Sequence, residues 1–167
     1  LHPLHRLGEA QLAEAVERVE QFYTPYHATL RRLVDETRAA FGHAVLIDAH
    51  SMPSQGASRT PGGRAVDVVL GDCYGSSCAA AVTEAAEQWL AGRGYAVTRN
   101  TPYAGGFTTR HYGRPRAGIH ALQVELNRAL YMDEATLSPT RGLARLTADM
   151  TDFAAALGAL EAEALAR

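Results

Sequence analysis

Apolar residues recur with a helical period over much of the first forty residues. From Gly8 to about Tyr23 an apolar side chain returns every three or four residues, which forms one helix face; these residues are Leu12, Val16, Val19 and Tyr23. Pro25 interrupts the pattern, because proline lacks the amide N–H and clashes with the preceding turn. The pattern resumes over Tyr26–Phe41. The sequence therefore predicts one kinked helix or two short helices.

Short apolar runs rich in branched side chains follow, and such runs favour buried strands. The first two are Ala44–Asp48 and Ala65–Leu70, separated by a Ser-, Gly- and Pro-rich stretch that predicts a surface loop. Tyr95–Arg99 and Ile119–Leu126 alternate between the two faces in the manner of strands. We therefore expect four strands.

Two further helices complete the predicted order. One covers Cys78–Gly92 with Ser77 as its cap, and the other runs from about Ser138 to Ala166 with Pro139 in its first turn. The irregular segment Asn100–Gly118 is rich in Gly, aromatic residues and Arg, and we expect a glycine-hinged lid over an anionic substrate. The order α-β-β-α-β-β-α predicts an α/β fold with a mixed, mostly parallel sheet flanked by helices, in one domain over residues 1–167.

Composition narrows the expected partners. The chain has 167 residues, a formal net charge of −2 and no basic face, so we do not expect it to bind nucleic acid. Its apolar runs are too short for a membrane span and no signal peptide is visible. Cys73 and Cys78 are expected to be free thiols in a cytoplasmic protein, with a local disulfide as the alternative. The sequence does not indicate the oligomeric state.

Polar residues gather where the first strand ends, the edge at which α/β sheets bind ligands. Asp48 precedes His50 by two residues, so both share one face in an extended chain, and the carboxylate could orient the imidazole as a metal ligand. Glu125 ends an otherwise apolar strand, and buried acids are rare unless paired or in use. If the two strands are neighbours, a metal at His50 and a base at Glu125 could hydrolyse an amide.

One histidine does not make a zinc site, because catalytic zinc takes three protein ligands. The chain contains no HExxH motif and no HxxE pair. The remaining ligands precede Leu1, or they come from scattered residues such as Asp48 or His120, or no metal binds. The residues alone leave these three explanations open.

Five blocks of sequence carry a resemblance to a known family. They read YTPYH (23–27), LIDAHSMPS (46–54), DVVLGD (67–72), NTPYAGG (100–106) and YGRPRAGIHALQVELNRALYMDE (112–134). The chain resembles the N-formylglutamate amidohydrolase family. This resemblance implies a fold like that of zinc carboxypeptidases (phosphorylase/hydrolase-like), and zinc-dependent cleavage of N-formyl-L-glutamate to formate and L-glutamate in histidine degradation.

The resemblance also implies roles for residues. His50 corresponds to the strand-end histidine that is the last zinc ligand in carboxypeptidases, and Glu125 to their catalytic glutamate. Family members are longer at the N-terminus, and their first two zinc ligands, an early histidine in a PHSG-like block and an acidic residue after it, have no counterpart here. The N-terminal part is therefore expected to be missing, and the chain resembles the C-terminal portion of the enzyme.

A small dicarboxylate substrate with an N-acyl group needs cations. Arg110 and Arg128 are the candidates for a carboxylate clamp. Asn100 and Tyr103 could donate hydrogen bonds to the substrate or its oxyanion, or could simply hold the loop. His120 lies roughly 16 Å along the strand from Glu125, which favours a structural role. A related N-acyl amino acid amidohydrolase and a truncated, non-catalytic domain are the alternative functions.

Overall fold

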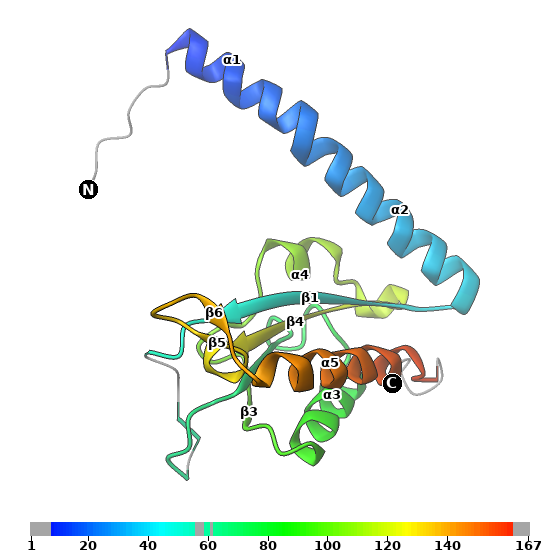
Figure 1. The fold of residues 1–167 in the computed structure, drawn as a ribbon. Helices are drawn as coiled ribbons and strands as arrows, with labels where there is room; N and C mark the ends of the chain where they lie inside the picture. Colours follow the sequence, from blue (N-terminus) through cyan, green and yellow to red (C-terminus); the bar gives the residue numbers. More distant parts are fainter. Residues whose placement is uncertain (1–7, 56–58, 61, 162–167) are drawn as a thin grey trace. The chain divides into compact units, whose positions relative to one another are not determined.

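The computed structural model describes residues 8–55, 59–60 and 62–161 (Figure 1). The chain divides into two compact units, Leu1–Glu36 and Thr37–Arg167.

The first unit is helical over its described residues. Helix α1 (Glu9–Arg18) leads into a π-helical turn (Val19–Tyr23), and α2 begins at Thr24 and extends to Phe41. The predicted break at Pro25 is wrong in position, because the helix continues through this residue. The irregularity lies one turn earlier, where the amide of Thr24 donates to the carbonyl of Val19 with the longer spacing of a π-turn.

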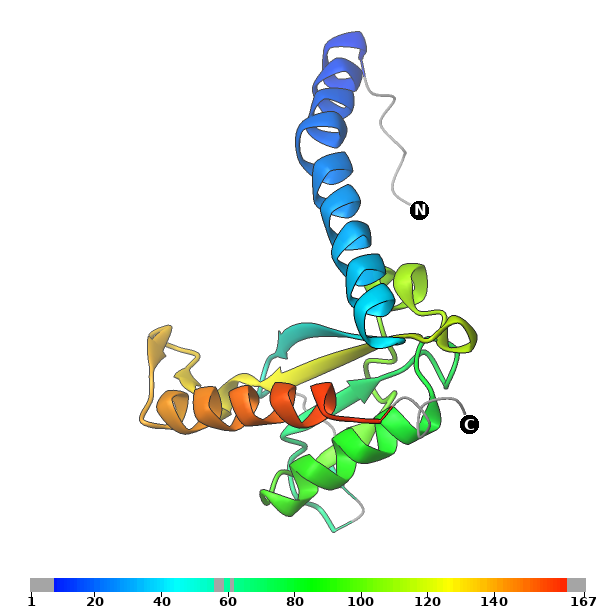
Figure 2. The ribbon, with the colours of Figure 1, turned by 90° about the vertical axis from the view of Figure 1, so that its right-hand side faces the viewer.

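The second unit is built on a four-stranded sheet in the order β1-β4-β2-β3 (Figures 1 and 2). Strand β1 (Ala44–Met52) pairs parallel with β4 (Ile119–Asn127), and β2 (Val68–Gly71) pairs parallel with β3 (Val97–Arg99). Strands β2 and β4 run antiparallel. The predicted mixed, mostly parallel sheet is confirmed.

Helices α3 (Ala80–Gly92) and α5 (Gly142–Gly158) cover one face of this sheet, whereas α4 (Phe107–Tyr112) lies on the other side (Figure 1). The core lies between the sheet and the helix pair, and its buried residues include Val68, Leu70, Leu122, Val124, Val82, Leu90, Leu146, Phe153 and Leu157. Because strand side chains alternate, Leu122, Val124 and Leu126 of β4 point into this core, whereas Gln123 and Glu125 point to the opposite face. That opposite face carries the candidate site.

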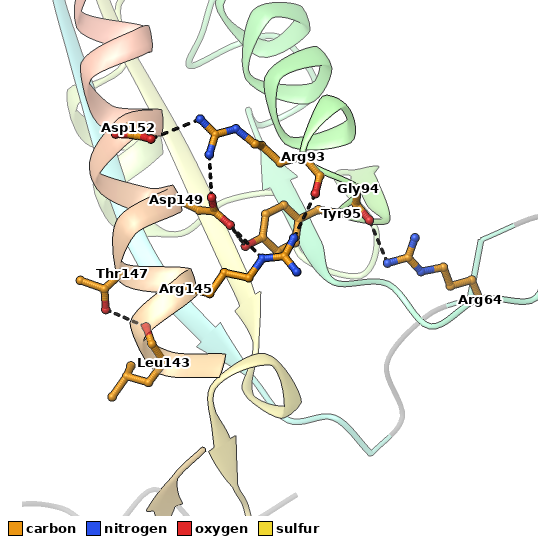
Figure 3. Close-up of polar contacts among 9 residues, drawn as sticks. All are labelled: Arg64, Arg93, Gly94, Tyr95, Leu143, Arg145, Thr147, Asp149 and Asp152. Atoms are coloured by element: carbon orange, nitrogen blue, oxygen red, sulfur yellow. Dashed lines mark hydrogen bonds and ion pairs between the residues drawn. The ribbon is translucent and has the colours of Figure 1, made fainter. Parts of the chain in front are cut away.

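A polar cluster ties the end of α3 to α5 (Figure 3). Asp149 accepts hydrogen bonds from the Tyr95 hydroxyl at 2.6 Å and from Arg93 Nη1 at 2.7 Å. Arg93 also reaches Asp152 at 3.2 Å and lies over the Trp89 ring. Burial and the bond to Asp149 raise the pKa of Tyr95 to about 12, and the bonds from Tyr95 and Arg93 lower the pKa of Asp149. The two helices are therefore joined by charge as well as by apolar packing.

Several predicted boundaries are wrong, each for a local reason. Ser77 does not cap α3: its hydroxyl donates to the carbonyl of Ala121 on β4, and Ala79 is the N-cap. The segment predicted as irregular contains α4 and a 3-10 turn, Pro115–Ala117. A second 3-10 turn, Arg128–Leu130, follows β4.

The last helix begins later than predicted. Ser138–Pro139 forms β6, which pairs antiparallel with β5 (Met132–Asp133), so Pro139 is not in a helical turn. Helix α5 then starts at Gly142, where a Cβ atom would overlap the carbonyl oxygen of Leu130. The predicted end near Ala166 lies outside the described residues.

Candidate active site

Strands β1 and β4 bring polar side chains together in a two-by-two array. Their parallel register pairs Asp48 with Gln123 and His50 with Glu125. Paired residues in a sheet share a face, and so do residues two apart on one strand. All four side chains therefore lie on the face turned away from α3 and α5. The predicted meeting of His50 and Glu125 is confirmed.

The imidazole of His50 lies between two carboxylates. Its Nε2 is 3.1 Å from Asp48 Oδ1, and its Nδ1 is 4.0 Å from Glu125 Oε1. The His50 side chain is 47% exposed, whereas those of Asp48 and Glu125 are 17% and 9% exposed. Asp48 therefore holds one ring nitrogen, and the other nitrogen faces Glu125 at a point that solvent can reach.

Glu125 is buried, and its position is held by a neighbour. Gln123 Nε2 donates a hydrogen bond of 2.7 Å to Glu125 Oε1, the same oxygen that faces His50. On its other side Glu125 pairs in register with Val69 of β2, whose side chain has no polar group. The site thus places a carboxylate beside an imidazole nitrogen, Nδ1, on a side chain that is 47% exposed.

The donors for a metal ion are incomplete in the part of the chain that the structure describes. No group of three or more His, Cys, Asp or Glu side chains there could hold a metal. His120 lies on the opposite face, where its Nδ1 accepts a hydrogen bond from the amide of Ala79 at 3.2 Å and burial lowers its pKa. Its predicted structural placement is confirmed. His50 can therefore supply one ligand but not a whole coordination sphere.

Comparison with known proteins identifies the family. Residues 2–132 match the family model described as N-formylglutamate amidohydrolase. The chain belongs to the N-formylglutamate amidohydrolase family. Over 134 residues it is 41% identical to N-formylglutamate deformylase of Pseudomonas putida and 40% identical to that of Pseudomonas aeruginosa, in each case covering 79% of this chain and 50% of the relative.

A solved structure supports the same assignment. The crystal structure of N-formylglutamate amidohydrolase from Ralstonia eutropha JMP134 matches with a TM-score of 0.78 and 35% identity, covering 92% of this chain and 54% of that one. The fold of the family is therefore present. The chain spans about half the length of the curated relatives that it matches.

The two predicted clamp arginines of this family member lie on different segments. Arg128 follows β4 directly, and its Nε donates to the Ser51 hydroxyl at 3.3 Å while Nη1 lies 3.9 Å from Glu134 Oε1. Arg110 is an exposed residue of α4, and its Nη1 donates to the carbonyl of Gly105 at 3.4 Å. Arg128 is thus tied to the strand end that carries His50, and Arg110 to the loop on the polar side of the sheet.

Asn100 is bonded to the turn that follows β2. Its Nδ2 donates to Asp72 Oδ1 at 2.8 Å, and its Oδ1 accepts from the Asp72 amide at 3.1 Å. This geometry favours the alternative that Asn100 holds the loop shape. Tyr103, two residues before Gly105, is 38% exposed. The substrate-binding roles of both residues stay predictions.

Gln123 and Gly106 were missed by sequence reasoning, although a signal for Gln123 was present. It precedes Glu125 by two residues on an alternating strand, which places both on one face. Gly106 is the N-cap of α4, and a Cβ atom there would lie 3.4 Å from Gln123 Oε1. The approach of this loop to β4 depends on tertiary packing, so no local pattern indicated it.

An open groove of about 800 Å³ reaches His50 from the side of α5. Its lining is mostly apolar and includes Leu126, Leu143, Leu146 and Met150. Neither Asp48 nor Glu125 lines it. An apolar groove suits a hydrocarbon group better than a carboxylate.

Two further predictions concern the chain as a whole. Cys73 and Cys78 are both free thiols, as predicted, and burial raises the pKa of Cys78 to about 12, which makes it a poor nucleophile. Among the described residues, no helix has the length and apolar character needed to cross a membrane.

Proposed function

We propose that this chain carries the catalytic base and one metal ligand of an enzyme that hydrolyses N-formyl-L-glutamate to formate and L-glutamate, the reaction expected in histidine degradation. The observation that carries the proposal is the pairing of His50 with Glu125 across β1 and β4. The names of the relatives, N-formylglutamate deformylase and amidohydrolase, point to the same substrate.

Zinc is the proposed cofactor, with Nδ1 of His50 as the ligand atom. This nitrogen is the better candidate because Nε2 already lies against Asp48. Zinc, when bound, would polarise the formyl carbonyl and lower the pKa of a bound water. The remaining ligands are expected outside the described residues, since those residues contain no group of three suitable side chains.

Glu125 is the proposed general base. Its Oε1 lies at the imidazole, so it is placed to accept a proton from the attacking water and later return it to the departing amine. Asp48 keeps the imidazole in one orientation during this transfer. Arg128 and Arg110 are the proposed partners of the substrate carboxylates, because guanidinium groups pair with carboxylates through two parallel hydrogen bonds.

A related N-acyl amino acid is the second candidate substrate. A panel of N-formyl and longer N-acyl glutamates separates the two substrates. We also propose a cytoplasmic location, which the free thiols of Cys73 and Cys78 support.

The decisive variant is Glu125→Gln, which keeps the size of the side chain and removes its basicity. We expect release of glutamate from N-formylglutamate to fall by about 100-fold or more, while bound zinc is unchanged. Rates and metal content are measured on the same zinc-loaded samples. Glu87→Gln is the matched control, because Glu87 pairs with Arg99 on β3, away from the site.

Full activity in the Glu125→Gln variant would remove Glu125 from the mechanism. A wild-type chain that holds no stoichiometric zinc and hydrolyses none of the panel would instead support the non-catalytic domain.

A further inference from the structure

We infer that Gln123 is the positioning residue of the catalytic base: its side-chain amide holds the Glu125 carboxylate against His50. The inference rests on the proposed function, because it concerns the base of that reaction. Gln123 would then act together with His50 and Glu125 in the site.

The contact geometry places Gln123 at the decisive oxygen. Its Nε2 donates to Glu125 Oε1 at 2.7 Å, and that oxygen is also the one 4.0 Å from His50 Nδ1. Rotation of the carboxylate away from the imidazole would therefore break this hydrogen bond. Gln123 thus restrains the atom that must meet the attacking water.

The orientation of the Gln123 amide is set by Glu125. An ionised carboxylate only accepts hydrogen bonds, so the NH₂ end of the amide must face it. The other end, Oε1, is buried and has no hydrogen-bond partner among the described residues. Gln123 is only 4% exposed. The contact to Glu125 therefore fixes which end of the Gln123 amide acts as the donor.

The surroundings of Gln123 leave Glu125 few other means of restraint. Val69, which pairs with Glu125 on the β2 side, cannot donate a hydrogen bond from its side chain. Gly106 lies beside Gln123 Oε1, at a distance where a Cβ atom would make an ordinary van der Waals contact of 3.4 Å.

Both strands show the same arrangement, in which a residue contacts the side chain two positions after it. Asp48 precedes His50 by two residues and contacts its imidazole, as Gln123 precedes Glu125 by two residues and bonds its carboxylate. The register places Asp48 beside Gln123, so the two supporting residues form one row and the two functional residues form the next.

The kinetic test uses Gln123→Met, which keeps the side-chain length and removes the donor. In the zinc-loaded chain we expect kcat for N-formylglutamate to fall about 10-fold or more, with KM within about twofold, since only the transition state uses the restraint. Tyr95→Phe is the matched control: it also deletes a buried hydrogen bond, to Asp149, but at the cluster that joins α3 to α5, away from the site. Wild-type kcat in Gln123→Met overturns the inference, and so does an equal loss in both variants.

A second measurement does not need turnover. The side-chain NH₂ signals of Gln123 are assigned by NMR through their absence in Gln123→Met, and one proton should be shifted downfield and exchange slowly with solvent. In Glu125→Met this proton should move upfield and exchange faster. Unchanged signals would overturn the contact. If the chain fails to hydrolyse any N-acyl glutamate while the signals respond, the proposed function fails and the contact stands.

Discussion

Alternation along β4 separates two buried polar residues that do different work. Glu125 faces the polar side of the sheet beside His50, whereas His120 faces the α3 side and accepts a hydrogen bond from the amide of Ala79. Residues whose positions differ by an odd number point to opposite faces of a strand, so the five-position difference alone fixes this division. The sequence therefore predicted that His120 and Glu125 lie on opposite faces of the sheet.

His120 should make the fold sensitive to acid. Burial, and to a smaller extent nearby His43, lower its pKa from the ordinary value of 6.5. In the unfolded chain the imidazole takes up a proton below about pH 6.5, and the folded protein resists this. The stability contribution is therefore full above that pH and is lost as the pH falls. His120→Gln should flatten the dependence of the urea unfolding free energy between pH 7.5 and pH 5.

The comparison concerns the slope with pH, not the absolute stability, because His120→Gln also changes packing. Equal slopes in the variant and the wild type would show that another group causes the acid sensitivity.

At the scale of elements, local patterns predicted the apolar strands and helices, and contacts between elements decided their ends. Ser77 had the composition of a cap, but the carbonyl of Ala121 took its hydroxyl. Pro139 suited a first helical turn, but pairing with Met132 placed it in β6. The partner of Ser77 is 44 residues away, whereas Pro139 pairs within a short hairpin; in both cases pairing with another segment outweighed the local preference.

The polar cluster between α3 and α5 is a second case of pairing that the sequence did not indicate. Asp149 is 6% exposed and accepts from both Tyr95 and Arg93 (Figure 3). Asp149→Ala removes the acceptor, so the buried Tyr95 hydroxyl loses its hydrogen bond to the Asp149 carboxylate. We expect the free energy of unfolding at pH 7 to fall by about 2 kcal/mol, measured by urea denaturation.

Asp152→Ala is the control for this cluster, because Asp152 meets the same arginine at the exposed surface, where ion pairs contribute little. The sign of the pH dependence gives a further check. Tyr95 and Arg93 lower the pKa of Asp149 below its ordinary 3.8, so its contribution is present above that pH and lost as the pH falls further. Similar losses in both variants would contradict the cluster's role.

At the scale of the whole second unit, one face of the sheet packs in the core and the other face carries the candidate site. Helices α3 and α5 bury one face of the sheet in the core, and the opposite face carries the row of Asp48 and Gln123 and the row of His50 and Glu125. The core residues were predictable from apolar runs, and the polar rows from alternation. Strands β1 and β4 lie more than 65 residues apart in the chain. The sequence analysis had to assume that they are neighbours, because strand order depends on the complete fold.

Metal binding tests the whole arrangement, because a ligand that binds only the folded state stabilises it. At a zinc concentration about 100 times the dissociation constant, the free energy of unfolding should rise by about 2.7 kcal/mol. His50→Ala should abolish this rise with little change in metal-free stability, since the side chain is 47% exposed. His111→Ala, on α4, should keep the rise. Thermal unfolding with and without zinc, together with metal content after dialysis, measures both effects. An equal rise in His50→Ala would place zinc elsewhere in the chain and leave Glu125 without the cation that its proposed role requires.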